Sequence, residues 1–435
     1  MIFYLLLILA GLLFFGLSYY RPMIALYLIA GLLPTYGIRF QIYNIPMTWL
    51  EVMILLLFVA VVIKKEFDFK KIKEDYFFWP IVAVLIFATI SIITSPVLIP
   101  AFNAWKSYFV EPILYYWLLI SLIKERRQIE GVFWALGVSV IYLSLVGIWQ
   151  KFSVWRMPVE FLKADGSVDR IVSVYSYPNA LGLYLGPIIV LFLGFLFYKN
   201  QDSLLLYLSN IKRFWFKLMV VILGFTAIVL AKSEGAVLAV LVCGWLLFFV
   251  NKKTRWPVLI ISVLSVIIFM FNETIREFVF IKIMFKDWSG IVRRAMWSET
   301  WEMLKVNWLW GAGLAGYKLK IIPYHIHEWF ETFAYPHNIL FNFWSELGLL
   351  GLLSFVWLGI KFILINLKNI FSIVCHYTHN LGFDKIASFV FLLVGLEIFI
   401  HGLVDAPYFK SDLAVLAWIL LGATVLNIRL KSKFD

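Results

Sequence analysis

The sequence predicts an all-α fold, a polytopic transmembrane helical bundle of about 12–13 spans, and three observations lead to this prediction. Of the 435 residues, 63% are hydrophobic, 19% are aromatic and only 15% are charged, so polar groups could not cover the surface of such a chain in water. Apolar segments of helical length recur along the whole sequence. Basic residues gather in short clusters at the ends of these segments, the pattern that orients a chain in a bilayer.

The first apolar segment, residues 2–20, carries no charge. At ~1.5 Å per residue it can cross the roughly 30 Å of a hydrocarbon core. It lacks a basic leading region and a cleavage site of small residues, so we expect a retained helix, with a removed signal peptide as the alternative. The other candidate spans fall near residues 22–37, 45–63, 77–95, 104–123, 129–149, 177–198, 214–231, 235–250, 256–272, 338–367, 386–405 and 411–427.

The Lys and Arg clusters orient these spans. If the lysines between residues 64 and 73 are cytoplasmic, strict alternation places the clusters at 124–127 and 252–255 and the C-terminal end on the same side. The N-terminus is then outside, and residues 150–177 and 272–337 form extracytoplasmic loops of a single membrane domain, residues 1–435. The net charge of +12 would suit a nucleic acid, but basic residues at span ends do not follow a phosphate backbone, so we expect no nucleic-acid partner.

The larger loop is too long for a plain connector and too rich in Trp for a disordered one. Arg293, Trp297 and Trp301 recur at intervals of four residues, and Lys305 continues the series. This spacing predicts one face of a helix from about 289 to 306. An interfacial helix anchored by its aromatic side chains would explain the pattern. Trp faces also stack on sugar rings, and the two roles are compatible.

Ionisable residues are costly in a membrane and therefore indicate function. With this topology they gather toward the outer face. Those in the spans are Lys232, Glu234, Glu346, His401 and Asp405, and those in the long loops are Arg170, Arg293, Arg294 and His337. The sequence therefore predicts a site that opens to the outside.

The turn from Lys232 to Gly235 joins two short apolar segments of ~27 and ~24 Å at ~1.5 Å per residue, against ~30 Å of hydrocarbon. The turn should therefore lie below the outer surface, where Lys232 could bind an anion at low dielectric constant. The alternatives are an ion pair between Lys232 and Glu234, or a lysine that extends to the interface.

His337 follows Pro336 at the start of a helix expected from about Ile339. Imidazoles titrate near neutral pH, so this histidine could serve as a general base, although a structural role at the helix start is the alternative. His401 and Asp405 lie four residues apart. On one helix they would share a face and could orient one another, or form a buried hydrogen bond without a role in chemistry.

Two further sequence matches, to a dinucleotide-binding motif and to a metal-binding pair, are not expected to have the functions that they resemble. Residues 311–316 match G-x-G-x-x-G, but no strand precedes them, so at most their backbone N–H groups could contact a phosphate. His325 and His327 resemble a metal-binding pair, but two histidines two residues apart in a loop lack ligand spacing. We therefore predict no metal and no cofactor.

Four motifs follow one another in the second half of the chain. They are Tyr-Pro-Asn-Ala-Leu-Gly at 177–182, Arg-Arg-Ala-Met-Trp at 293–297 with Trp-Gly-Ala-Gly at 310–313, Pro-His-Asn at 336–338 with Ser-Glu-Leu-Gly-Leu-Leu-Gly at 345–351, and His-Gly-Leu-Val-Asp at 401–405. In this order they resemble motifs of the O-antigen ligase and O-antigen polymerase superfamily of bacterial membrane glycosyltransferases. The resemblance covers roughly residues 170–410.

The resemblance implies a membrane glycosyltransferase that moves a glycan from a polyprenyl-diphosphate carrier to an acceptor hydroxyl on a glycan, lipid or protein. The reaction would take place at the outer face of the bacterial cytoplasmic membrane, as in lipopolysaccharide biosynthesis, without a nucleotide sugar or a metal. His337 would be the base for the acceptor, and Arg293 would stabilise the leaving diphosphate. The residues expected to bind diphosphate or glycan are Lys232, Arg170, Arg294, Asn338, Glu346, His401 and Asp405.

The chain departs from the family at one turn, since Ser233-Glu234-Gly235 stands where the family commonly has Ser-Arg-Gly. Lys232 is the expected substitute for the missing arginine. The main alternative function is a transporter or flippase of lipid-linked or small polar substrates. A transporter or flippase would be expected to have internal repeats and charges spread through the membrane, and the sequence shows neither. A non-enzymatic membrane scaffold is a third possibility.

Overall fold

The computed structural model describes residues 2–42, 45–196, 204–327, 329–371 and 383–431. These residues fold mainly into helices, and their one sheet is a hairpin of β1 (Arg39–Ile42) and β2 (Ile45–Thr48), in which Arg39 pairs with Thr48. Thr48 then caps the next helix, because its hydroxyl accepts from the backbone N–H of Glu51. The predicted all-α architecture is confirmed.

Every predicted apolar segment contains a helix. In the N-terminal half the helices are α1 (Ile2–Tyr20), α2 (Pro22–Gly31), α3 (Trp49–Ile63), α4 (Phe69–Lys73), α5 (Phe78–Ile93), α6 (Leu98–Trp105), α7 (Glu111–Leu122) and α8 (Arg126–Ser153). In the C-terminal half they are α9 (Pro178–Leu196), α10 (Leu204–Leu230), α11 (Glu234–Val250), α12 (Arg255–Phe271), α13 (Glu273–Ile283), α14 (Trp288–Val306), α15 (Tyr317–Lys320), α16 (Ile339–Phe371), α17 (Phe383–Gly402) and α18 (Ser411–Lys431).

Seven of the described helices are long and apolar enough to cross a membrane alone: α1, α8, α9, α10, α16, α17 and α18. An eighth span results if α12 and the helices that follow it to Val306 are counted as one span, bent by 98° between them. Four further apolar helices, α2, α3, α5 and α11, are shorter. Three predicted spans are interrupted: 22–37 continues past α2 as a 3-10 turn, 104–123 contains a π-helical turn, and 338–367 breaks at Gly348, whose φ is +72°. The chain is thus a multi-pass membrane protein with several broken helices.

Helices α9 and α18 lie at the centre of the bundle, with 83% and 78% of their most apolar windows buried. Close packing around α9 depends on its glycines. A Cβ at Gly182 would lie 2.4 Å from the Ser233 hydroxyl, and one at Gly186 would lie 2.1 Å from a carboxylate oxygen of Glu397. These contacts hold the N-terminus of α11 and the C-terminal half of α17 against α9, which brings residues near 180, 234 and 402 together.

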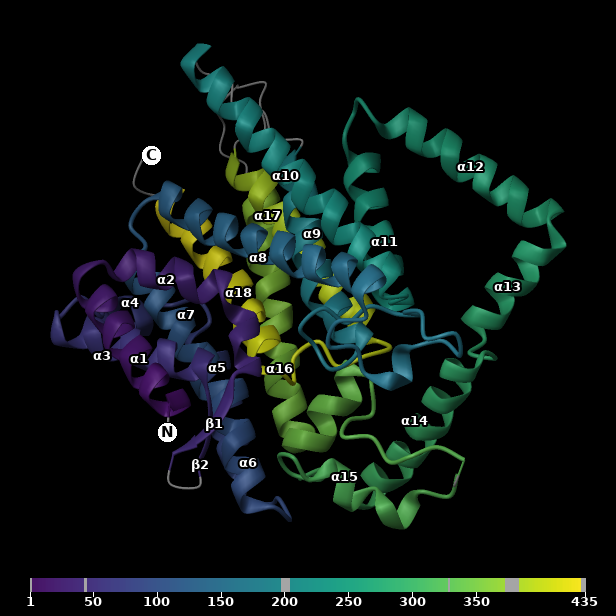
Figure 1. Ribbon diagram of the computed structural model, residues 1–435, viewed down its shortest axis with the longest axis horizontal. Helices are drawn as coiled ribbons and strands as arrows, with labels where there is room; N and C mark the ends of the chain where they lie inside the picture. Colours follow the sequence, from purple (N-terminus) through teal and green to yellow (C-terminus); the bar gives the residue numbers. More distant parts are fainter. Residues whose placement is uncertain (1, 43–44, 197–203, 328, 372–382, 432–435) are drawn as a thin grey trace.

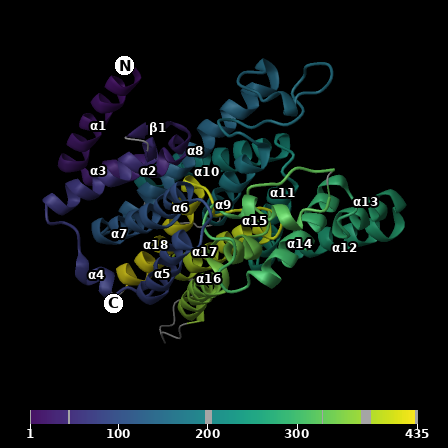
Figure 2. The same cartoon turned by 90° about the horizontal axis from the view of Figure 1, so that it is seen from below.

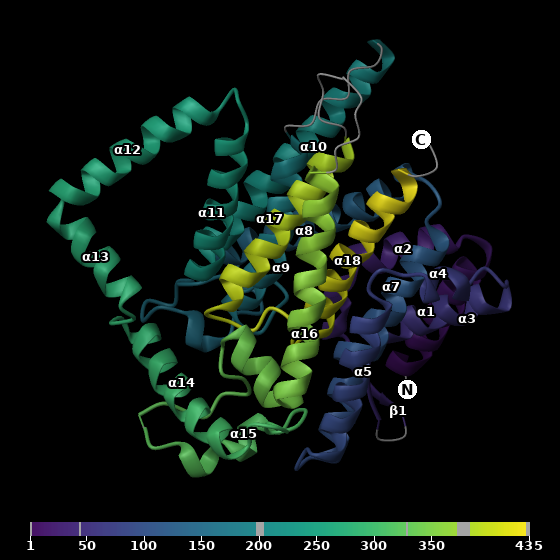
Figure 3. The same cartoon turned by 180° about the vertical axis from the view of Figure 1, so that it is seen from behind.

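The two ends of the bundle carry different connections (Figures 1 and 3). The end of α18 and the turn between α11 and α12 lie at one end, whereas the β-hairpin, α6 and α15 lie at the other. This arrangement agrees with the alternation of basic clusters. We expect reporter fusions after Lys65, Arg127 and Lys253 to give cytoplasmic signals and a fusion near Lys318 to give an extracytoplasmic one. A cytoplasmic signal at Lys318 would contradict this topology.

Helices α12 and α13 form an arm that stands away from the bundle, at the edge opposite α1 (Figures 1 and 2). Neither helix buries a residue, and Asn272 starts α13 by accepting the N–H of Ile275. The chain then returns through α14, which confirms the helix predicted at about 289–306 and buries Met303 and Leu304. The sequence did not predict α13, because the region was treated as a loop with one helix.

Candidate functional site

The turn after α17 brings together side chains from distant parts of the chain. The carbonyl oxygen of Leu403 accepts from the side-chain amide of Asn338 (3.0 Å), and that of Val404 accepts from Nε of Arg293 (3.0 Å). The carboxylate of Asp405 lies 2.9 Å from Nδ1 of His337. Four of the predicted site residues therefore meet at the turn formed by residues 403–405. They are Arg293, His337, Asn338 and Asp405.

The pairing with Asp405 fixes the tautomer of His337. Burial alone would raise the pKa of the Asp405 carboxyl, but electrostatic attraction to His337, the hydrogen bond between them and the N–H of Ala406 hold that pKa below its usual range. An ionised carboxylate only accepts hydrogen bonds, so Nδ1 of His337 must donate. In the neutral ring Nε2 is then an acceptor. Asp405 is 1% exposed and His337 26% exposed, so the histidine can meet a substrate while its partner is buried.

Asn179 links this pair to Arg170 and was missed as a site residue. Its amide nitrogen donates to the second carboxylate oxygen of Asp405 (3.0 Å), and its amide oxygen accepts from Arg170 (2.9 Å). A guanidinium only donates and a carboxylate only accepts, so the amide has one possible orientation. Burial lowers the pKa of Arg170, and the charge of Arg293 lowers it further. The Pro-Asn helix start was the available signal, but the sequence did not reveal its partner.

The backbone at His337 is left-handed, with φ of +43°. This conformation is unfavourable for a non-glycine residue by about 1–3 kcal/mol and is often found at functional sites. Neighbouring contacts hold it in place. The indole N–H of Trp297 donates to the carbonyl oxygen of Pro336 (2.8 Å), and the side chain of Asn338 caps α16 by accepting the N–H groups of Leu340 and Phe341.

Lys232 lies beside this network without extending into it. Its side chain is 56% exposed and pairs with Asp169 (2.6 Å), and this hydrogen bond lowers the pKa of Asp169. Its backbone carbonyl oxygen accepts from Arg170 (3.3 Å). Glu234, at the position of the missing arginine, pairs instead with Lys282 of α13 (2.7 Å). The alternative of a Lys232–Glu234 ion pair is therefore wrong.

His401 and Asp405 were expected either to orient one another or to form a buried hydrogen bond, and both alternatives are wrong. Helix α17 ends at Gly402, so Asp405 lies beyond the helix and points to His337 and Asn179. His401 is buried and faces Glu397, with 3.7 Å between Nδ1 and the carboxylate. A spacing of four residues places two side chains on one face only if both lie on the same continuous helix.

Glu346 and the glycine-rich turn bind each other. Glu346 is fully buried, and its carboxylate accepts a hydrogen bond from the N–H of Ala315 (2.6 Å). The N–H of Ala312 donates to the carbonyl oxygen of Ser345. The G-x-G-x-x-G match at residues 311–316 was expected to be false, and its N–H groups at Ala312, Leu314 and Ala315 already have protein acceptors, which leaves no support for a phosphate contact there. Arg294 is exposed on α14, next to Arg293.

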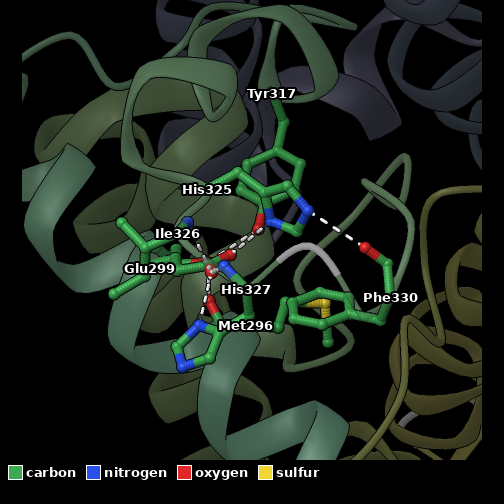
Figure 4. A network of polar contacts seen from close by, with 8 residues as sticks. Met296, Glu299, Tyr317, His325, Ile326, His327 and Phe330 are labelled. Atoms are coloured by element: carbon green, nitrogen blue, oxygen red, sulfur yellow. Dashed lines mark hydrogen bonds and ion pairs between the residues drawn. The ribbon is translucent and has the colours of Figure 1, made fainter.

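His325 and His327 surround a carboxylate (Figure 4). Nδ1 of each ring lies within hydrogen-bond distance of the buried Glu299 (2.9 and 2.7 Å), and the N–H groups of Ile326 and His327 donate to the same side chain. Nε2 of His325 lies 3.0 Å from the carbonyl oxygen of Phe330. The two histidines thus fasten a loop to α14. In the described residues no group of three or more His, Cys, Asp or Glu side chains is arranged so that it could hold a metal ion.

Comparison with known proteins supports the motif-based interpretation. Residues 218–356 match the family model described as O-antigen ligase. The chain is also 23% identical over 311 residues to a protein named O-antigen ligase from Salmonella typhimurium, an alignment covering 67% of this chain and 70% of that protein. The resemblance to the O-antigen ligase superfamily is confirmed. The segment that matches the O-antigen ligase model contains Arg293 and His337, whereas Asn179 and Asp405 lie outside it.

Proposed function

We propose that this protein is a membrane glycosyltransferase of the O-antigen ligase type, which transfers a glycan from a polyprenyl-diphosphate carrier to an acceptor hydroxyl. One observation carries the proposal: the turn at residues 403–405 holds a histidine oriented by a buried carboxylate next to an arginine from α14. A base and a cation at one site are what glycosyl transfer with a diphosphate leaving group requires.

In the proposed reaction Nε2 of His337 accepts the proton of the acceptor hydroxyl as its oxygen attacks the anomeric carbon of the donor glycan. The bond from that carbon to the diphosphate oxygen breaks, and its electron pair leaves with polyprenyl diphosphate. The resulting imidazolium is stabilised by Asp405, which stays ionised because its pKa is low. The proton then passes to the departing diphosphate or to water.

Arg293 and Arg170 are the cations proposed for the leaving group. Arg293 uses Nε to bind the carbonyl oxygen of Val404, so its terminal nitrogens extend beyond that contact and can bind phosphate oxygens. Arg170 is half-buried behind Asn179 and is held by the carbonyl oxygen of Ala231 (3.0 Å). Lys232 would contribute at the exposed rim. No nucleotide sugar and no metal take part in this scheme.

The site is proposed to face the extracytoplasmic side of a bacterial cytoplasmic membrane. Helix α15 and the β-hairpin lie at the end of the bundle opposite the basic turn between α11 and α12 (Figure 1). Arg170, Arg293 and His337 belong to residues 150–177 and 272–337, the two loops that the sequence predicts to be extracytoplasmic. A lipid tail would lie between helices while the glycan extends into water.

Reconstituted proteoliposomes test this function against the transporter alternative. With lipid-linked glycan and an acceptor present, we expect a new covalent product in which the glycan is attached to the acceptor. A flippase would instead move the intact lipid-linked glycan from one leaflet to the other without changing its covalent structure. Translocation without any covalent product would contradict the proposal.

Asp405→Asn is expected to lower turnover by roughly 10²-fold, since a base that is wrongly oriented loses most of a contribution of about 10²–10⁴. An amide in place of the carboxylate would set an N–H group against the donating amide of Asn179, or lose the bond to His337. Steady-state transfer assays measure the effect. The matched control is Asp169→Asn, which removes a carboxylate from the exposed ion pair with Lys232 and should change turnover far less.

A further inference from the structure

A continuous series of aromatic rings leads away from His337. Phe333 meets the imidazole edge to face (5.4 Å between centroids) and stacks near Phe330 (6.3 Å). Phe330 contacts Trp329 (4.9 Å), which contacts Trp288 at the start of α14 (5.3 Å). We call Phe333, Phe330, Trp329 and Trp288 the aromatic strip.

The outer end of the aromatic strip is open to solvent, since Trp329 is 44% exposed and Trp288 66% exposed. Its rings are held in position by polar contacts and only partly by burial. The carboxylate of Glu299, 3% exposed, receives four hydrogen-bond contacts from His325, Ile326 and His327, and Figure 4 shows His325 turned between this carboxylate and the carbonyl oxygen of Phe330.

The two histidines also contact the rings of the strip directly. His325 meets Phe330 edge to face (4.8 Å), and His327 lies against Trp329 (5.6 Å). The buried carboxylate of Glu299 thus fixes the loop, and the loop fixes the exposed rings. A surface that keeps large apolar rings exposed and ordered is typical of a binding site.

We infer that the aromatic strip binds sugar rings of the acceptor, with the C–H faces of pyranoses stacked on Trp329 and Trp288. This inference rests on the proposed function, because it takes its direction from His337, the group assigned to the acceptor hydroxyl. The ring next to that base, Phe333, lies nearest the acceptor sugar, and the strip continues outward from it. Anchoring to the bilayer is a weaker explanation, because an interfacial anchor requires neither ordered rings nor continuity with His337.

The test measures saccharide binding separately from transfer. Wild-type protein in lipid nanodiscs is mixed with the acceptor glycan freed from its lipid, without donor, and saturation-transfer NMR is recorded on the sugar protons. We expect saturation of pyranose ring protons, with affinity about tenfold weaker in Trp329→Ala and largely restored in Trp329→Phe. In transfer assays Trp329→Ala should raise KM for the acceptor by a similar factor, with little change in kcat or in KM for the donor.

Trp308→Ala is the matched control, because Trp308 is 54% exposed in the same region but lies outside the strip, and it should bind saccharide normally. Equal saccharide affinity in wild type and Trp329→Ala would overturn the inference. Lower stability in bilayers with unchanged affinity would overturn it in favour of bilayer anchoring. If saccharide binding depends on Trp329 but wild-type protein transfers no glycan, the proposed function fails while saccharide binding by the strip is supported.

Discussion

His337→Ala is expected to lower turnover of glycan transfer by roughly 10²–10⁴-fold, the usual contribution of a well-placed general base. The pairing with Asp405 leaves Nε2 of His337 as the acceptor, and alanine offers no substitute for it. KM for the lipid-linked donor should change little, since the base acts on the acceptor hydroxyl. Steady-state assays with purified donor and acceptor measure both quantities.

His337→Asn is the companion variant for this prediction. Asparagine tolerates the left-handed backbone at this position better than alanine does, so it separates loss of the base from strain at the start of α16. Both variants should insert and purify like wild type, and both should lose activity. Transfer at the wild-type rate by either one would remove His337 from the mechanism.

Arg293→Ala is expected to lower turnover by roughly 10²–10³-fold, because charge develops on the leaving diphosphate and a fixed cation stabilises it. The loss of its bond to Val404 would also loosen the turn that holds Asp405. Arg293→Lys should restore only part of the activity, since an ammonium group lacks the planar fork that matches phosphate.

Lys305→Ala provides the control on the same helix. Lys305 continues the spacing of Arg293, Trp297 and Trp301, but its side chain is 52% exposed and pairs with Glu302 at the surface. Removing it should change turnover less than twofold, consistent with the small contribution of exposed ion pairs. Equal losses in Arg293→Ala and Lys305→Ala would show that α14 acts through general charge and would contradict a specific phosphate contact.

The elements of the site could be predicted from local sequence. Spacing of four residues identified α14, and Pro336 marked the start of α16. The basic clusters also predict an outer position for His337 and Arg293, which the reporter fusions would test. These features depend on short stretches of chain, where periodicity and helix boundaries leave a visible pattern.

The contacts within the site could not be predicted, because they join distant segments. Asn179 and Asp405 are 226 residues apart, and His337 and Asp405 are 68 apart. The end of α17 at Gly402 separated His401 from Asp405, although both lie in one motif. Lys282 of α13 neutralises Glu234 at the turn that departs from the family, and no local pattern marks this lysine as its partner.

One charged residue, Glu346, has a structural contact that the sequence did not reveal. Glu346 was predicted to bind substrate, yet it is buried against the glycine turn and satisfies the N–H of Ala315. The sequence showed a carboxylate in a span, which is costly unless paired, but could not show that its partner is a backbone group.

The most direct test of the central claim is the product balance of the purified protein in EDTA. The protein is supplied with polyprenyl-diphosphate-linked glycan and acceptor, without any nucleotide sugar, and both products are quantified by mass spectrometry. The proposed mechanism predicts one polyprenyl diphosphate released for each glycan transferred, at the same rate with and without EDTA. Transfer that stops in EDTA, or release of polyprenyl monophosphate in place of diphosphate, would contradict it.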